Sequence, residues 1–307
     1  MLAVIIAISA YGVDVNLRPE NNLMLLDPGI GSPFPAAADY NMGGMGAMCV
    51  SSPTARAYDP NEGIDHAPKG EFVALLRFDF NKLRGFAIND IALKLAITCG
   101  NQSAFSVYNF RGAAGDFDLS FVTSDWKAGW RTAHGTHSTD PIEEGTSFNS
   151  FADILAAYPA EKLETLYYDA RYPYSAGENW FTFELDPQLE SYTNILNTAS
   201  GGQMVTFMLS PSENSGVCFN VRPYKQNTSD TAYTIRSTGP VLSVDVEYRA
   251  AVVDFSADDH IGYDDLLMLA GQWLESGSCD IYPPMGDGIV DMADLAVLSG
   301  YWYEIVE

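Results

Sequence analysis

Short apolar or alternating runs, separated by clusters of Gly, Pro, Asn and Asp, fill most of the chain up to residue 248. Runs of this length and periodicity are typical of β-strands joined by turns. The predicted strands are 13–17, 22–26, 45–50, 72–80, 88–98, 105–110, 180–185, 204–211, 216–221 and 241–248. Many short strands joined by long loops predict a mainly β fold, a β-sandwich or jelly roll.

Apolar residues at helical spacing interrupt this pattern twice. One segment, 148–158, ends at Pro159, which cannot continue a helix. The other, 186–196, begins with Asp186 as a favourable N-cap and Pro187 as a favourable first helical residue. A single apolar stripe on this second helix indicates packing against the sheets rather than a cofactor site.

The pattern changes in the last fifth of the chain, where one unit occurs twice. Each copy is an acidic loop followed by an apolar helix, and a shift of 29 residues aligns 254–273 with 283–302. In this alignment the acid that ends the first loop, Asp265, meets Asp294. A repeat this close indicates a duplicated structural unit.

The first copy has the spacing of a twelve-residue Ca²⁺ loop. Oxygen donors fall at positions 1, 3, 5, 7 and 12, which are Asp254, Ser256, Asp258, the backbone carbonyl of His260, and Asp265. Ca²⁺ takes roughly six to eight such hard oxygen ligands. Position 6 is Asp259, where Gly is usual, but Asp tolerates a left-handed backbone better than most residues. A solvated acidic loop would explain one copy, whereas two aligned copies favour Ca²⁺.

The second copy departs from this spacing. Strict alignment puts Pro283 and Met285 at positions 1 and 3, and neither side chain is a Ca²⁺ ligand. Either this loop is degenerate, or Asp280 takes position 1 through a longer connecting segment. The candidate ligands are Asp280, Asp287, Asp291, Asp294 and the backbone of Ile289, the counterpart of His260.

Two Ca²⁺-loop–helix units in succession resemble a type I dockerin over residues 252–304. The resemblance implies a small C-terminal α-helical, EF-hand-like domain at 251–307, after a β domain at 1–250. It also implies a protein partner of the cohesin type, bound through the helices. Dockerins carry small hydroxyl residues at loop positions 10 and 11, where this chain has Tyr263, Asp264, Met292 and Ala293. We therefore expect these four residues to contact a cohesin-like or other surface protein rather than a standard cohesin.

Five segments of the β region resemble, in order, motifs of the DNRLRE-type domains. They are the turn at 41–44, the strand pair at 72–83 and 88–95, the loop at 124–129, the segment 219–222 and the closing strand at 240–248. The resemblance implies an extracellular β-sandwich, found beside polysaccharide-degrading modules and in large surface proteins. Some members bind acidic polysaccharides such as alginate.

Charge narrows the choice of partners. The formal net charge is −24, and residues 251–307 hold twelve Asp and Glu but no Lys or Arg. Nucleic acid and anionic lipid are therefore poor partners, and divalent cations are good ones. No apolar run reaches the length of a membrane span. Residues 1–10 are either a signal remnant or the first strand, so a secreted or cell-surface location is expected from the resemblances alone.

The four cysteines, Cys49, Cys99, Cys218 and Cys279, are widely spaced. The absence of a CxxC pair excludes a zinc ribbon or thioredoxin motif. An even count is compatible with disulfides outside the cell, and buried free thiols are an equally good interpretation.

Aromatic side chains beside cations in two loops are the candidates for sugar binding, because their flat faces can stack on sugar rings. The best surface candidates are Trp130, Arg131, Arg171, Tyr172 and Tyr174. The alternative is that aromatic residues of these loops belong to the core, with Trp126 capping the sandwich.

Three functions follow from these patterns. The first is a non-catalytic secreted protein, whose polysaccharide-binding sandwich is attached to a partner through a calcium-stabilised dockerin-like domain. The second is a structural subunit of an extracellular surface layer, matrix or filament that associates with itself. The third is a polysaccharide lyase or hydrolase. No catalytic motif stands out in the sequence, so the non-catalytic function is preferred.

Overall fold

The computed structural model confirms a mainly β protein with a large antiparallel sheet. Secondary structure and burial are described below for the parts of the chain that the structure describes. These are residues 13–27, 48–55, 57–59, 64–66, 70–83, 86–98, 113–122, 126–128, 145–157, 159–170, 179–186, 204–227, 233–235, 239–282, 286–303 and 305–306.

Eleven strands form the large sheet. They are β1 (Val13–Leu17), β2 (Asn21–Asp27), β3 (Met48–Ser51), β6 (Glu71–Asp79), β7 (Phe86–Thr98), β8 (Gly115–Val122), β9 (Glu161–Tyr168), β10 (Asn179–Leu185), β11 (Met204–Pro211), β12 (Cys218–Val221) and β15 (Val241–Tyr248). Their order is β1-β15-β7-β12-β3-β6-β11-β8-β9, with β10 added beside β7 and β2 beside β6. Two ribbons are separate: β4 (Ala57–Asp59) with β5 (Ile64–His66), and β13 (Lys225–Asn227) with β14 (Tyr233–Ile235).

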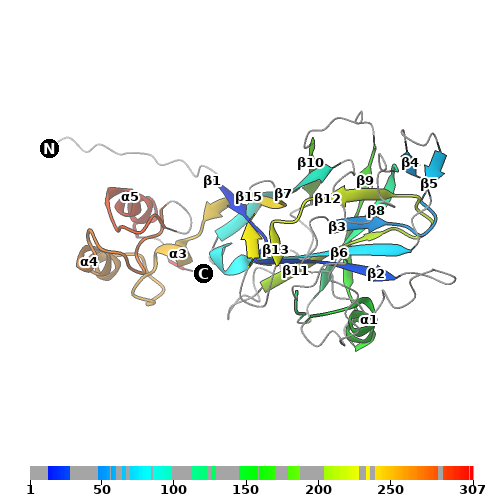
Figure 1. Cartoon of the computed structure of the whole chain (residues 1–307). Coiled ribbons are helices and arrows are strands. Elements are labelled where there is room, and N and C mark those ends of the chain that lie inside the picture. Colours follow the sequence, from blue (N-terminus) through cyan, green and yellow to red (C-terminus); the bar gives the residue numbers. More distant parts are fainter. Residues whose placement is uncertain are drawn as a thin grey trace.

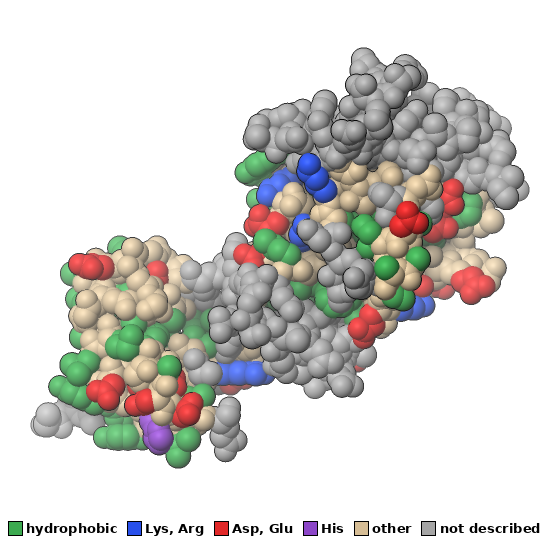
Figure 2. Space-filling view, turned by 90° about the horizontal axis from the view of Figure 1, so that it is seen from below, with side chains coloured by type: hydrophobic (Ala, Val, Ile, Leu, Met, Phe, Trp, Pro, Cys, Tyr) green, Lys and Arg blue, Asp and Glu red, His purple; other side chains and the backbone are tan. Residues whose placement is uncertain are grey.

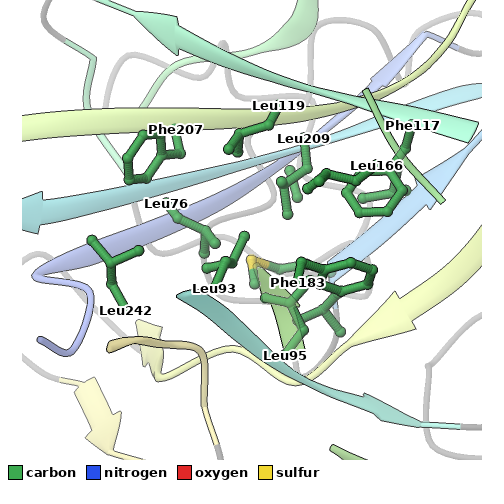
Figure 3. Close-up of a cluster of buried hydrophobic side chains, with 14 of the residues drawn as sticks. Leu76, Leu93, Leu95, Phe117, Leu119, Leu166, Phe183, Phe207, Leu209 and Leu242 are labelled. Atoms are coloured by element: carbon green, nitrogen blue, oxygen red, sulfur yellow. The ribbon is translucent and has the colours of Figure 1, made fainter. Parts of the chain in front are cut away.

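The sheet folds back on itself around one apolar core (Figure 1). Side chains of β7, β10 and β15 meet side chains of β6, β8 and β11 in a single buried cluster. Figure 3 shows ten of these residues together: Leu76, Leu93, Leu95, Phe117, Leu119, Leu166, Phe183, Phe207, Leu209 and Leu242. This arrangement is consistent with the predicted sandwich, in which inward-facing residues of two layers form the core.

A helix covers the outer face of one layer. Alternate residues of β6 point to opposite sides: Phe72 and Leu76 enter the main core, whereas Val73 and Leu75 enter a second cluster. Phe151 of α1 (Phe148–Ala157) closes that second cluster. The helix predicted at 148–158 is therefore confirmed.

Three of the four cysteines are described, and all three are buried free thiols. Cys49 of β3 is directly opposite Asn220 of β12. Cys218 is two residues from Asn220 on that strand, so Cys49 and Cys218 lie on the same face of the sheet. Burial, followed by a hydrogen bond and a charge interaction with Cys218, raises the pKa of the Cys49 thiol well above its usual value. The interpretation as buried thiols thus holds for Cys49, Cys218 and Cys279.

The end of the chain forms a separate apolar cluster beside the last strand. It contains α3 (Ala250–Val253), α4 (Tyr263–Gly271), α5 (Met292–Gly300) and the loops between them. Figure 1 places these helices at one end of the molecule, beyond β15. We refer to residues 254–306 as the C-terminal repeats and to residues 13–248 as the β region. None of the helices in the described residues is long and apolar enough to cross a membrane.

Candidate metal sites in the C-terminal repeats

A fully buried Asp organises each loop of the C-terminal repeats. Asp265 is 0 % exposed, and its two oxygens accept hydrogen bonds from the backbone N–H groups of Ser256 (2.9 Å) and Gly262 (2.7 Å). Asp265 lies in the first turn of α4, where the helix dipole favours a negative charge. One carboxylate thus joins the start of the loop to the start of its helix.

Asp294 has the same role in the second loop. It is 0 % exposed and lies in the first turn of α5. One oxygen accepts from the N–H groups of Ile281 (2.7 Å) and Tyr282 (2.8 Å), and the other accepts from Asp291 (2.8 Å). The two position-12 carboxylates therefore hold their loops through equivalent hydrogen bonds.

The loops also begin alike. Asp254 accepts hydrogen bonds from the N–H groups of Asp258 (3.2 Å) and Asp259 (3.0 Å). Asp280 accepts from the N–H groups of Asp287 (3.0 Å) and Gly288 (2.7 Å). Asp280 therefore takes in loop two the place that Asp254 takes in loop one. This geometry agrees with the second of the two interpretations of the sequence, in which loop two begins at Asp280 and its connecting segment is longer.

Residues with a left-handed backbone conformation (positive φ) form the turn of each loop. At position 6, Asp259 has φ 63° and Gly288 has φ 98°. The residue two places earlier is also left-handed in both loops, Ala257 at φ 55° and Gly286 at φ 72°. The expectation that Asp259 adopts the backbone usually taken by Gly is confirmed.

Each loop is tied to the end of the other repeat. At position 8, Ile261 and Val290 are buried (1 % and 0 % exposed). The carbonyl of Ile261 accepts from the N–H of Tyr303 (2.9 Å), beyond α5, and the carbonyl of Val290 accepts from the N–H of Leu274 (2.9 Å), beyond α4. The two halves are thus related by an approximate twofold arrangement.

The remaining candidate ligands are less alike. The Ser256 hydroxyl at position 3 donates to Asp254 (3.3 Å), whereas Tyr282 holds this position in loop two. The position-5 acids Asp258 and Asp287 are exposed. Each accepts a hydrogen bond from the backbone N–H at position 7, which is His260 (3.0 Å) in loop one and Ile289 (3.1 Å) in loop two. Asp291 caps α5 by accepting from the N–H of Ala293 (2.7 Å). Loop one therefore has the fuller set of oxygen donors.

The carboxylates are engaged mainly with the backbone of their own loops. Among the described residues, no three acidic, His or Cys side chains converge as a ready metal cluster. The donor set of a Ca²⁺ loop also includes a hydroxyl and a backbone carbonyl, which at loop one come from Ser256 and His260. Loop one thus has the donor chemistry of a Ca²⁺ loop, and both loops share one backbone frame.

The helices carry exposed apolar side chains. Tyr263 and Met292, the predicted partner-binding residues at the start of α4 and α5, are 67 % and 65 % exposed. Asp264 is also exposed, and Ala293 is half-buried. Figure 2 shows hydrophobic and acidic side chains side by side over this lobe. The four predicted contact residues therefore lie next to each other in pairs, at the same place on each helix.

The predicted sugar-binding residues lie outside the described part of the chain, namely Trp130, Arg131, Arg171, Tyr172 and Tyr174. Two neighbours along the sequence, Tyr167 of β9 and Trp180 of β10, are 60 % and 43 % exposed. These two residues were not among the predicted site residues. The sequence signal that could have identified them is an aromatic residue at a strand position that faces outward.

Trp126 is a structural residue. It is 4 % exposed, and its indole N–H donates to the Thr206 hydroxyl (2.8 Å). Arg77 stacks over its ring, with the guanidinium carbon 4.4 Å from the ring centroid, and donates to its carbonyl (2.8 Å). The interpretation of Trp126 as a cap on the sheet is confirmed.

Comparison with known proteins gives no further guide to these loops. No family model matches the chain, and no curated protein matches it either. The candidate metal sites therefore rest on the duplicated geometry of Asp254 with Asp265 and of Asp280 with Asp294.

Proposed function

We propose that the chain is a non-catalytic secreted or cell-surface protein with two functional parts. Its β domain binds polysaccharide, and its C-terminal repeats form a dockerin-like domain that Ca²⁺ stabilises and that attaches the protein to a partner. The observation that carries the calcium part is the repeated frame, in which a buried position-12 Asp and a position-1 Asp hold each loop.

The charge of the repeats supports a bound cation. Asp265 and Asp294 are completely buried, and an opposite charge stabilises a buried carboxylate beyond what hydrogen bonds and a helix N-terminus supply. Backbone N–H groups supply the hydrogen bonds, but residues 251–307 contain no Lys or Arg. A divalent cation would supply the missing positive charge from solution.

The ligand chemistry favours Ca²⁺ over other metals. The candidate donors are carboxylate, hydroxyl and carbonyl oxygens, which suit hard cations rather than Zn²⁺. Mg²⁺ demands a near-ideal octahedron, whereas Ca²⁺ accepts irregular sets of the kind offered here. Loop one, with Asp254, Ser256, Asp258, His260 and Asp265, is expected to bind the more tightly.

Thermal unfolding of the full chain tests the calcium proposal. At a Ca²⁺ concentration about a hundredfold above its Kd, we expect the unfolding midpoint of the repeats to rise by on the order of 10 °C, because Ca²⁺ binds only the folded form. The variant Asp265→Asn should lose most of this increase. Asp264→Asn is the matched control, because Asp264 is the exposed neighbour of the buried acid. Identical midpoints in Ca²⁺ and in EDTA would contradict the proposal.

Exposed apolar side chains favour a second candidate function, a structural subunit that associates with itself. Tyr263, Leu267 and Leu274 on one repeat, and Met292 and Tyr303 on the other, are all more than half exposed. In this alternative, these side chains supply the contact surface between subunits.

One pair of measurements separates the two functions. The leading proposal predicts that the full chain binds alginate or pectin on a glycan array and has a monomer mass by light scattering in Ca²⁺. The structural-subunit alternative predicts assemblies in Ca²⁺ that dissociate in EDTA, with no glycan bound. Turnover of polymeric uronates in the same samples would instead support the polysaccharide-degrading alternative.

A further inference from the structure

Tyr248 stands between the β region and the C-terminal repeats. It is the last residue of β15, and its ring packs against Phe86 of β7 with the ring centroids 4.9 Å apart. It packs against both the main core and the core of the repeats. Burial, followed by charge interactions with Tyr282, Asp294 and Tyr301, raises the pKa of its phenol, so the phenol stays protonated and remains a donor.

Two hydrogen bonds connect Tyr248 to the repeats. Its hydroxyl donates to the carbonyl of Ile281 (2.9 Å), and its own carbonyl accepts from the hydroxyl of Tyr301. Both partners belong to the second repeat, since Ile281 is position 2 of loop two and Tyr301 follows α5. Both hydrogen bonds of Tyr248 therefore lead to the second repeat, and one of them leads to loop two.

Ile281 is held from both sides. Its N–H donates to the buried carboxylate of Asp294 (2.7 Å), and its carbonyl accepts from Tyr248. Its neighbour Asp280 holds the turn of loop two. Ile281 is itself 8 % exposed, so it has little room to move alone. Ile281 therefore lies between the acids of loop two and the hydroxyl of Tyr248.

We propose that cation binding in loop two is coupled, through Ile281 and Tyr248, to the seating of the repeats on the β region. This inference rests on the proposed calcium function. Asp280 and Asp294 would be among the acids that hold a cation in loop two, and its charge would offset their repulsion and so favour the hydrogen bond between the Tyr248 hydroxyl and the Ile281 carbonyl. Without the cation, repulsion among the four acids of the loop loosens Ile281 and releases the repeats from a fixed orientation. The four acids are Asp280, Asp287, Asp291 and Asp294.

The coupling has a reciprocal consequence. If a cation in loop two favours the contact between Ile281 and Tyr248 by a certain factor, the contact must raise the affinity of loop two for the cation by the same factor. Loop one has its position-12 bonds to Ser256 and Gly262 within its own repeat, so its affinity is expected to be independent of Tyr248.

Calorimetric titration of the full chain with CaCl₂ tests the affinity side. The variant Tyr248→Phe keeps the ring on Phe86 and removes only the hydroxyl, so we expect about fivefold weaker binding at one of two sites, the effect of losing one ordinary hydrogen bond. The control Tyr303→Phe removes a hydroxyl from a side chain that is 83 % exposed, and should leave both sites unchanged.

Small-angle scattering of the same proteins tests the orientation side. In Ca²⁺ the wild type should give a compact, well-defined profile, and EDTA should increase its maximum dimension. Asp280→Asn in loop two should give the extended profile even in Ca²⁺, whereas Asp254→Asn in loop one should keep the compact one.

The outcomes separate the coupling from the function on which it rests. If the full chain binds no Ca²⁺, both the calcium function and the coupling are wrong. If it binds Ca²⁺ with affinities and a scattering profile that Tyr248→Phe leaves unchanged, the coupling is wrong and the calcium function stands.

Discussion

At the scale of single residues, three carboxylates lie in a row across neighbouring strands of the β region. Asp245 of β15 is directly opposite Asp14 of β1 on one side and Asp90 of β7 on the other. Like charges at directly opposite positions destabilise a sheet. Partial burial, followed by the charges of Asp14, Asp90 and Glu247, raises the pKa of the Asp245 carboxyl.

This row predicts a stabilising substitution. Because the folded-state pKa of Asp245 is above its unfolded value, the group opposes folding when it is charged and ceases to do so as pH falls through the folded pKa. Asp245→Asn should therefore stabilise the protein by about 0.5 kcal/mol at pH 7. The gain should disappear near pH ~3, where the wild-type carboxyl is protonated as well.

Urea unfolding at the two pH values measures this difference. Asp116→Asn is a suitable control, because Asp116 is an exposed strand residue that lies opposite Tyr167 rather than an acid. An equal effect of Asp245→Asn at both pH values would show that charge repulsion is not its cause.

At the scale of elements, the sequence pattern predicts the bounds of several strands to the residue. The bounds predicted at 13–17, 204–211 and 241–248 agree with β1, β11 and β15. The strands β8 and β9 were not predicted. In β9 the residues Lys162 and Thr165 are exposed and only Leu166 and Tyr168 are buried, so its pairing with β8, rather than its own pattern, makes it a strand.

The second loop shows a different limit of the sequence. A fixed shift of 29 residues aligns the helices and the position-12 acids correctly, but it places Pro283 at position 1. Seven positions separate Asp280 from Asp287, whereas four separate Asp254 from Asp258. The hydrogen bonds of Asp280 show that the additional residues of the second repeat lie inside loop two, between Asp280 and Asp287. The spacing of residues in the sequence does not give these side-chain contacts.

Helix α1 gives a prediction at this scale. Phe151 is 3 % exposed and fills the cluster between α1 and the outer face of β2 and β6. Phe151→Ala should lower the free energy of unfolding of the β region by about 3–4 kcal/mol, through lost burial and the cavity left behind.

Denaturant unfolding of Phe151→Ala measures this loss of stability. Asp153→Ala is the control, because Asp153 is an exposed residue of the same helix. A loss smaller than about 1 kcal/mol would mean that α1 contributes little to the stability of the sheet. The proposed stabilisation of the repeats by Ca²⁺ should be the same in both variants, because the second cluster is separate from the cluster of the repeats.

At the scale of the whole molecule, negative charge is spread unevenly. The 57 residues from 251 to 307 carry −12, and the preceding 250 residues carry 16 − 28 = −12. The net negative charge per residue is thus several times higher in residues 251–307 than in the preceding part of the chain, and all the Lys and Arg residues lie in that preceding part. Because repulsion among like charges is screened by ions, we expect salt to affect the stability of the repeats more than that of the β region.

The crossed ties between the repeats have a consequence for how this end of the chain is built. Loop one is completed by Tyr303 and Val306, whose N–H groups bond to Ile261 and Asp259, and loop two is completed by Leu274 and Glu275. The segment that follows each helix therefore bonds to the loop of the other copy, as exchanged segments do in a domain-swapped dimer. A single copy would lack its closing segment, so we expect the smallest unit able to fold to be the pair, which has the arrangement of an isologous dimer within one polypeptide.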